Sequence, residues 1–398
     1  MKSYSLAIIV DRYWPSLGGV EQATLSLAAS FPADWSVTVI THPPTTGSTL
    51  YSMFTSSHKM PTNDPSGNVI EPLIAGRLGR FLLIPLLLWN LPFIRSYRPR
   101  MLYDALYRWY YIVFHRKIEH LLADVDSVHC ISTGYLARCV TDVCLKKGIR
   151  FVHEPFIHFE RWGDTNAQLR AYALADAIIC PTFSFKQRFL DKLNISIPVN
   201  VAVIPPVIVE PQYPKLRLPP VPGRFILFLG RREAHKGLAG LLVAFNGLEH
   251  LASLVIAGPG EQVRTRNMVV FDLGEVDDKI KGWLLFSCDF LCVPTTDETF
   301  GIVFAEAMSF GKPVVGYDIA PVNEIVKNGE SGILVPPDDT ESLHRALETM
   351  LTDHQLRKSM GAAAKERYLH LFARDIVIGE IVGLHKKKRS SNASIRPQ

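Results

Sequence analysis

The hydrophobic positions of this chain fall into short continuous runs, separated by longer stretches in which apolar residues recur at helical spacing. In the first half of the chain, the runs span residues 5–10, 36–40, 127–131, 149–153 and 177–180. Helical spacing is found between them, over residues 21–31, 135–147 and 165–175. Continuous rather than alternating hydrophobicity is typical of strands buried on both faces of a parallel sheet, so the pattern predicts a first α/β domain.

The same alternation begins again near residue 225. Its apolar runs span residues 225–229, 253–257, 268–272, 289–293 and 313–316. Helical spacing recurs over residues 237–248, 276–287, 302–310 and 340–352. Two such series predict an α/β chain of two Rossmann-like, doubly wound domains. Because ligands of such sheets bind beyond the carboxyl ends of the strands, we expect an interdomain cleft lined by the loops that follow the strands.

Proline content and the end of the helical pattern predict the domain boundaries. Seven prolines lie between residues 205 and 223, a density that predicts an extended linker. After the last helix of the second series, an interrupted helical pattern continues to residue 386, and we expect the basic tail beyond it to be disordered. The predicted segments are an N-terminal domain (1–205), a linker (206–223), a C-terminal domain (224–372) and a helix end with its tail (373–398).

Composition narrows the class of protein. Of 398 residues, 47% are hydrophobic and 20% are charged, which excludes a disordered chain and gives each domain enough residues for its own core. The six cysteines include no Cys-x-x-Cys pair, and we interpret them as buried apolar residues in a reducing compartment. The most apolar stretch, residues 81–94, is shorter than the roughly 20 residues of a spanning helix. We therefore expect a cytoplasmic protein that is soluble or attached to the inner face of a membrane.

The net charge of +5 is concentrated in one segment. Residues 77–118 include eight basic residues and one acidic residue, so this segment carries +7, an excess too local to indicate a nucleic-acid partner. The segment also has ten aromatic residues. Basic and aromatic residues together suit an anionic membrane surface, with Leu82, Leu83, Trp89 and Phe93 entering the lipid. The alternative is an inserted helical hairpin that packs against the domain.

Two loops that follow predicted strands have features of anion-binding sites. Gly18 and Gly19 precede the first helix, where they let the backbone approach a ligand, although such a turn can also be purely structural. Arg231 and Lys236 flank the loop after the strand 225–229. Two cations at a helix start suit a diphosphate, and a solvated basic loop is the alternative.

Two glutamates flank the start of the helix predicted over residues 302–310. Glu298 lies in the loop before the helix, where it could also act only on the helix dipole, and Thr299 or Asp297 is expected to cap the helix. Glu306 lies within an apolar run of the helix itself. A carboxylate in such a run needs a polar partner, and ligand hydroxyl groups would serve.

The segment from Glu298 through Glu306 to Val315 resembles the E-x7-E signature of the retaining glycosyltransferases grouped as family 4. Further stretches are similar to motifs of that family: the loop 18–21, His153 at a strand end, residues 175–184, 203–206, 230–237 and 324–336. The matches cover residues 1–42 and 120–372. The resemblance implies the GT-B fold and transfer of a sugar from a nucleotide-diphosphate sugar.

The resemblance also assigns roles to residues. Arg231 and Lys236 would neutralise the diphosphate of the leaving nucleotide, which is the main electrostatic task of the reaction. Glu298 would contact the sugar hydroxyl groups, Glu306 would contact the ribose, and His153 would face the sugar near the reacting centre. The implied catalytic residues are His153, Arg231, Lys236 and Glu298, and the implied donor-binding residues are Gly18, Gly19, Arg231, Lys236, Gly301, Ile302, Val303 and Glu306.

No metal and no other cofactor is expected. Asp124 and Asp126 form a D-x-D sequence that precedes a predicted strand, whereas the metal-binding D-x-D of the other glycosyltransferase fold follows one. His129, His153 and His158 lack the close pairing of zinc ligands. The basic loop would supply the positive charge instead.

The expected function is retaining transfer of a sugar to a lipid-linked or glycan acceptor, in cell-envelope or polysaccharide synthesis. Two alternatives remain: a non-hydrolysing sugar-nucleotide epimerase, and an inactive GT-B subunit that binds a partner. The E-x7-E helix argues against the first, and the joint presence of Arg231, Lys236, Glu298 and Glu306 argues against the second. The chain departs from the family at Pro206, where asparagine is common.

Overall fold

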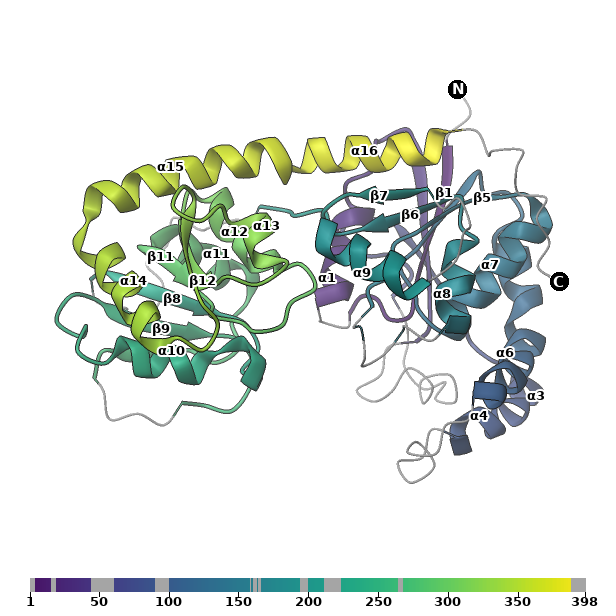
Figure 1. Ribbon diagram of the computed structural model, residues 1–398. Helices are drawn as coiled ribbons and strands as arrows, with labels where there is room; N and C mark the ends of the chain where they lie inside the picture. The colour runs from purple at the N-terminus through teal and green to yellow at the C-terminus, as the bar shows by residue number, and fades with distance from the viewer. Residues whose placement is uncertain are drawn as a thin grey trace. The chain divides into compact units, whose positions relative to one another are not determined.

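A computed structural model gives the fold of the chain (Figure 1). It describes residues 4–15, 19–43, 61–89, 100–157, 159, 163, 166–193, 200–210, 223–263 and 268–387. The chain divides into two compact units: unit 1 comprises residues 1–180, 186–204 and 378–398, and unit 2 comprises residues 181–185 and 205–377. Each unit is built on its own parallel sheet.

Unit 1 contains a seven-stranded sheet in the order β3-β2-β1-β4-β5-β6-β7, and all neighbouring strands pair in parallel. Strands β4, β5 and β6 are buried along their whole length, as is typical of parallel strands covered on both faces, although only β6 is continuously apolar. The strands are β1 (Tyr4–Val10), β2 (Trp35–Thr41), β3 (Val69–Pro72), β4 (Ser127–Cys130), β5 (Arg150–His153), β6 (Ala177–Cys180) and β7 (Val201–Val203).

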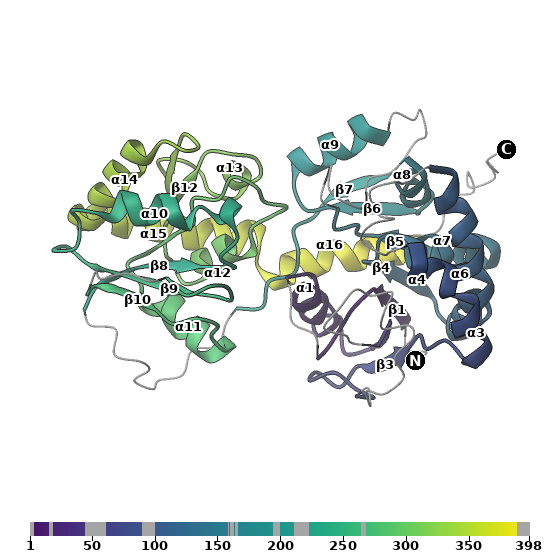
Figure 2. The same ribbon diagram turned by 90° about the horizontal axis from the view of Figure 1, so that it is seen from below.

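Helices of unit 1 pack side by side on the sheet. Helix α7 contacts α6, α8 and strands β4 and β5 (Figure 2). The last helix, α16, also reaches this sheet, through residues of its C-terminal half. The helices are α1 (Gly19–Ala28), α3 (Arg77–Leu82), α4 (Ile84–Trp89), α6 (Arg100–Leu121), α7 (Tyr135–Lys147), α8 (Asn166–Ala173), α9 (Phe183–Leu193) and α16 (Arg374–Lys386).

Unit 2 contains a six-stranded parallel sheet in the order β10-β9-β8-β11-β12-β13. Strands β8 and β9 are buried at every residue and pair over five positions. The strands are β8 (Phe225–Leu229), β9 (Ser253–Ala257), β10 (Val270–Asp272), β11 (Phe290–Cys292), β12 (Val314–Tyr317) and β13 (Gly332–Val335).

Helices cover both faces of the unit 2 sheet. Helix α10 lies on one side, together with α14, and α12 and α15 lie on the other (Figure 1). The side chains of Phe228, Leu254, Phe304 and Leu347 are fully buried in the core between these layers. The helices are α10 (Leu238–Phe245), α11 (Asp278–Ser287), α12 (Ile302–Ser309), α13 (Val322–Ile325), α14 (Thr340–Thr352) and α15 (His354–Leu371), with a short 3-10 turn, η1 (Ala234–Lys236).

The long helical pattern at the end of the chain forms two helices, α15 and α16, with Phe372 as the C-cap of the first. The sequence analysis ended the C-terminal domain at residue 372. In the structure, unit 2 continues to residue 377, and residues from 378 onward belong to unit 1. Most of the basic tail and most of the proline-rich linker lie outside the described residues.

The basic, aromatic segment 77–118 is part of the first unit and not a separate insertion. Its long helix α6 lies between β3 and β4 along the chain and packs against α7. Tyr110 and Phe114 of α6 are buried, which confirms the packing interpretation for these aromatic residues. Leu83, which was expected to enter lipid, is fully buried, so that expectation is wrong for it, because α6 covers the hairpin formed by α3 and α4.

Other apolar residues of this segment are exposed. Leu78 and Phe81 of α3 are 73% and 68% exposed, and Leu88 of α4 is 52% exposed. Phe93 lies outside the described residues. Among the helices that the structure describes, none is long and apolar enough to cross a membrane.

Candidate functional site

The polar residues predicted in the second domain lie at one edge of the unit 2 sheet. From β8 the strand order runs through β9 to β10 on one side, and from β11 through β12 to β13 on the other. Strands β8 and β11 are therefore neighbours, and the chain leaves their carboxyl ends in opposite directions across the sheet. Open α/β sheets bind ligands at such a position, and the loops after β8 and β11 lie there. These two loops carry Arg231, Lys236 and Glu298.

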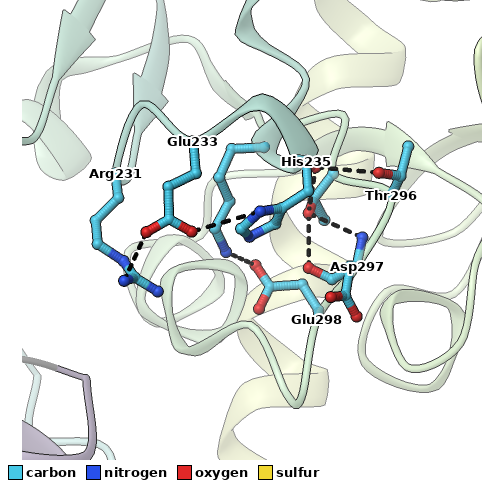
Figure 3. Close-up of polar contacts among 8 residues, drawn as sticks. Arg231, Glu233, His235, Thr296, Asp297 and Glu298 are labelled. Carbon is cyan, nitrogen blue, oxygen red and sulfur yellow. Dashed lines mark hydrogen bonds and ion pairs between the residues drawn. The ribbon is translucent and has the colours of Figure 1, made fainter. Parts of the chain in front are cut away.

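The loop after β8 is joined to the loop after β11 through the backbone carbonyl group of His235 (Figure 3). The carbonyl oxygen of His235 accepts hydrogen bonds from Thr295 Oγ1 at 3.0 Å and from Thr296 N at 2.8 Å. Within the first loop, Arg231 Nη1 lies 2.7 Å from a carboxylate oxygen of Glu233. The Arg231 side chain is 61% exposed, so this surface pair is weak and the guanidinium can turn to a phosphate instead.

Lys236 and Glu298 form an ion pair that joins the two loops. Lys236 Nζ donates a hydrogen bond to Glu298 Oε1, and the two side chains are only 14% and 11% exposed. Because both side chains are largely buried, removing one of them would leave the other as an unpaired charge and would destabilise the folded state. The sequence predicted both residues as part of the site but gave no indication that they contact each other.

A close approach of two backbones fixes the spacing of these loops. Gly237 has a φ of +74°, and a Cβ atom at this position would lie 1.9 Å from the carbonyl oxygen of Pro294. Only glycine fits both the left-handed conformation and this contact. The first loop approaches the loop after β9 in the same way, since a Cβ at Gly258 would lie 2.1 Å from the carbonyl oxygen of Gly230.

Helix α12 begins at the end of the loop after β11. Its N-cap residue is Gly301, with a φ of +89°, and no side chain of the described residues caps the helix. The expectation that Thr299 or Asp297 caps it is wrong, because the N-cap position is taken by a residue without a side chain. The backbone N–H groups of Ile302 and Val303 are thus not used by a side-chain cap, and a helix start of this kind can bind an anion.

Glu306 has a partner that the sequence analysis missed. Lys281 of α11 donates a hydrogen bond from Nζ to Glu306 Oε1 at 2.6 Å, and the Glu306 side chain is 9% exposed. No signal for this pair is present in the sequence, because Asp277 and Asp278 at the start of α11 already lie near Lys281 along the chain.

A further ion pair, between Arg232 and Asp272, supports the neighbouring loops. Arg232 Nη2 donates to Asp272 Oδ1, and Nη1 donates to the carbonyl oxygen of Glu261 at 2.8 Å. Asp272 also accepts hydrogen bonds from the backbone N–H groups of Val263, at 2.7 Å, and Gly274, at 2.9 Å. The side chains of Arg232 and Asp272 are 4% and 9% exposed, so this pair orders the loops, while Nε of Arg232 has no hydrogen-bond partner among the described residues.

The site residues predicted in the first domain belong to unit 1. Gly18 lies outside the described residues. Gly19 is the first residue of α1, and a Cβ atom there would meet no atom within 4 Å. Glu21 of α1 pairs with Arg12 at 3.1 Å.

His153 is fully buried at the end of β5. Its Nε2 lies 2.9 Å from the carbonyl oxygen of Ser132 and therefore carries the ring proton, while Nδ1 has no partner among the described residues. Burial lowers the pKa of His153 to about 4, so the ring is neutral at pH 7. The imidazole thus keeps one acceptor nitrogen without a partner.

The expected absence of a metal stays a prediction. Within the described ranges, no group of three or more His, Cys, Asp or Glu side chains is placed to hold a metal ion. Asp126 of the D-x-D sequence accepts a hydrogen bond from the backbone N–H of Ser5 at 2.8 Å. His129 contacts Glu154 and another histidine, and His158 lies outside the described residues.

Sequence comparison connects the second unit to a known family. Residues 212–367 match the family model described as "Glycosyl transferases group 1". The phosphatidyl-myo-inositol mannosyltransferase of Mycolicibacterium smegmatis is 35% identical over 190 residues, which cover 45% of this chain and 48% of the relative. The D-rhamnosyltransferase WbpZ of Pseudomonas aeruginosa is 32% identical over 160 residues, covering 37% and 42% of the two chains. The chain thus spans about half the length of these curated relatives.

Structural comparison covers almost the whole chain. HepE of Anabaena, solved in complex with UDP, superimposes with a TM-score of 0.68 at 16% identity, covering 96% of this chain and 98% of HepE. A sucrose-phosphate synthase of Thermosynechococcus elongatus superimposes with a TM-score of 0.65 at 19% identity, covering 96% and 98%. At these identities the likeness shows the fold alone, which is the predicted GT-B fold of two Rossmann-like domains.

Proposed function

We propose that this chain, whose residues 212–367 match the glycosyl transferases group 1 family, is a retaining, metal-independent glycosyltransferase. It would move a sugar from a nucleoside-diphosphate sugar to a lipid-linked or glycan acceptor. The bond between the anomeric carbon and the diphosphate oxygen breaks, and a bond to an acceptor hydroxyl oxygen forms on the same face of the sugar. The hydroxyl proton passes to the nucleoside diphosphate as it leaves. The observation that carries the proposal is the partly buried Lys236–Glu298 pair at the diverging strand ends of unit 2.

The residues of this site suit the parts of such a donor. Lys236 and the exposed Arg231 neutralise the diphosphate as it leaves, and the N–H groups of Ile302 and Val303 add donors from the start of α12. Glu298 holds Lys236 in place and can accept hydrogen bonds from sugar hydroxyl groups. The site therefore offers cations to the phosphates and a carboxylate to the sugar.

Glu306 and His153 complete the proposed assignment. Lys281 holds one oxygen of Glu306, and the carboxylate can accept hydrogen bonds from the ribose hydroxyl groups through the other. The unpartnered Nδ1 of the neutral His153 ring can accept a hydrogen bond from the donor sugar. The role of His153 requires no change of its protonation at pH 7.

Isothermal titration with UDP, GDP, ADP and dTDP tests this site before the acceptor is known. We expect saturable binding of at least one nucleoside diphosphate to the wild-type chain, weakened in the Lys236→Ala variant. If no nucleoside diphosphate of the panel binds, the result favours the alternative left open by the sequence, that the chain is an inactive GT-B subunit. Binding followed by epimerisation of the matching nucleotide sugar would favour the epimerase.

Removal of divalent metals is expected to leave transfer unchanged. The cationic side chains of Arg231 and Lys236 neutralise the phosphates, which a divalent ion does in other transferases. Initial rates are measured with the nucleotide sugar selected above, with and without excess EDTA. Activity that EDTA abolishes and Mg²⁺ or Mn²⁺ restores would contradict the metal-independent mechanism and direct attention to Asp124 and Asp126.

Attachment to a membrane surface is part of the same proposal. Leu78, Phe81 and Leu88 expose apolar side chains on the hairpin of α3 and α4, and Arg77 beside them is also exposed. Exposed apolar residues next to basic ones suit the boundary between head groups and acyl chains of an anionic membrane. This surface would bring the chain to a lipid-linked acceptor.

Flotation with vesicles of equal amounts of phosphatidylglycerol and phosphatidylcholine tests this surface. We expect binding that weakens as salt rises, since charges are screened beyond about 8 Å at physiological ionic strength. The double variant Leu78→Ser, Phe81→Ser is expected to lose binding. Leu190→Ser on α9, where leucine is 37% exposed, serves as the matched control. Equal binding of the double variant and the control would contradict the assignment of this surface.

A further inference from the structure

One face of the unit 1 sheet carries polar side chains where a hydrophobic core would be expected. Ser127 and His129 of β4 share this face, because alternate residues of a strand point the same way. Arg150 and Glu154, at the start and just beyond the end of β5, lie on the same face, since Ser127 is paired with Arg150 and His129 with Val152. These four residues are at most 8% exposed.

The C-terminal helix covers this polar face with a histidine. His385 of α16 is 2% exposed, and its Nδ1 lies 2.5 Å from Ser127 Oγ. Its Nε2 lies 3.0 Å from Nδ1 of His129, whose Nε2 in turn lies 3.0 Å from Glu154 Oε2. Arg150 donates from Nε and Nη2 to the carbonyl oxygen of Leu384 in the same helix. Four side chains therefore form a continuous hydrogen-bonded chain from Ser127 to Glu154.

The two histidines can relay hydrogen bonds along this line of side chains. Burial, together with the nearby His129 and Arg150, lowers the pKa of His385 well below its usual range, so its ring is neutral at pH 7. A neutral ring donates from one nitrogen and accepts at the other, so His385 can join Ser127 to His129. Ser127 Oγ also lies 3.3 Å from the carbonyl oxygen of Arg150, to which it can donate.

The carboxylate of Glu154, at the end of this line of hydrogen bonds, lies at the carboxyl end of a strand, where parallel sheets of this type bind ligands. Glu154 follows the last residue of β5, and its side chain is 7% exposed. Among the described residues only its Oε2 has a side-chain partner, and Oε1 is not one of the fully buried atoms without a partner, so Oε1 can be reached from solvent. A buried polar network stabilises one orientation of its members when they are paired, so this carboxylate is held with one oxygen available to a ligand.

We propose that Glu154 binds hydroxyl groups of the acceptor, and that His129 and His385 are positioning residues that orient its carboxylate. This inference rests on the proposed function. A carboxylate repels phosphates and accepts hydrogen bonds from hydroxyl groups, so its ligand is the polyhydroxylated part of the acceptor, a sugar or cyclitol ring. The diphosphate of the donor has its own cations in unit 2.

Kinetics of three variants test the inference, with octyl mannoside and phosphatidylinositol vesicles as acceptors. Glu154→Gln keeps the size of the side chain and is expected to raise the acceptor KM about 10- to 100-fold, as for the loss of a hydrogen bond to a charged group. The donor KM and the slow hydrolysis of the donor by water should not change. His385→Phe should raise the acceptor KM less, and His385→Gln, which keeps an N–H donor, should restore it.

Thr141→Val is the matched control. Thr141 is a buried residue of α7, and its hydroxyl donates a hydrogen bond to the carbonyl oxygen of Ala137 in the same helix, outside the Ser127–Glu154 hydrogen-bond line. This variant should change the thermal stability only slightly, and it should change neither the acceptor KM nor the donor KM. An unchanged acceptor KM in Glu154→Gln, or equal rises in the acceptor and donor KM, would overturn the inference while leaving the proposed function intact. A wild-type chain that neither hydrolyses nor transfers any donor sugar would overturn both.

Discussion

Alanine in place of both Arg231 and Lys236 is expected to lower kcat/KM for the donor about 10²- to 10⁴-fold, because each charge-assisted hydrogen bond to phosphate contributes about 1.5–3 kcal/mol. Lys236 should account for more of the loss. Its side chain is the less exposed of the two, and its removal leaves Glu298 as an unpaired carboxylate facing the phosphates. Initial rates over a range of donor concentrations give the ratio directly.

Lys327→Ala is the matched control for this prediction. Lys327 also pairs with a glutamate, Glu330, at 2.7 Å, but both side chains are more than half exposed. Such pairs contribute at most about 1 kcal/mol to stability, so the control should keep its activity. Wild-type turnover in the Arg231→Ala, Lys236→Ala double variant would remove the basic loop from the mechanism.

Alanine at Gly237 is expected to destabilise unit 2 by about 2–5 kcal/mol and to abolish nucleotide binding. A left-handed conformation costs a non-glycine residue about 1–2 kcal/mol, and forcing a Cβ into a filled space costs about 1–3 kcal/mol more. Here the Cβ would lie 1.9 Å from the Pro294 carbonyl oxygen, so the loops after β8 and β11 must separate. Separation moves Lys236 away from Glu298.

The variant Gly247→Ala separates the cost of a left-handed backbone conformation from the cost of the steric clash with Pro294. Gly247 has a φ of +90°, but a Cβ atom there would meet nothing within 4 Å. This variant should lose only the smaller, conformational part of the stability and should keep nucleotide binding. Melting temperatures and calorimetric titrations of both variants give the comparison. Equal losses in the two variants would show that the contact with Pro294 does not control the spacing of the site.

The sequence predicted the strands well where burial on both faces leaves a continuous apolar run. Strands β1, β6, β8 and β9 are of this kind, and their predicted positions agree with the structure. Strand β4 also lies where it was predicted, although Ser127 and His129 interrupt its apolar sequence. Strand β7 was not predicted, because it has three residues and each is only partly buried. Strand β3 begins with an exposed valine, and such a short edge strand has no distinct pattern.

Side-chain contacts between distant segments could not be predicted in the same way. The loops carrying Lys236 and Glu298 were identified because both follow strands, whereas the Lys281–Glu306 pair joins two helices and follows no motif. Composition likewise could not tell which residues of 77–118 face inward. Tyr110 is buried and hydrogen-bonded to His42 at 3.0 Å, while Trp109 beside it is 38% exposed.

The most direct test of the central claim is an assay of sugar transfer itself. The chain is incubated with UDP-, GDP-, ADP- and dTDP-linked hexoses and with lipid and glycan acceptors, and products are identified by mass spectrometry and by the anomeric coupling in NMR spectra. The account predicts one glycosylated product whose anomeric configuration matches that of the donor, and none with the Arg231→Ala, Lys236→Ala double variant. A product of inverted configuration, or an epimerised nucleotide sugar with no transfer, would contradict it.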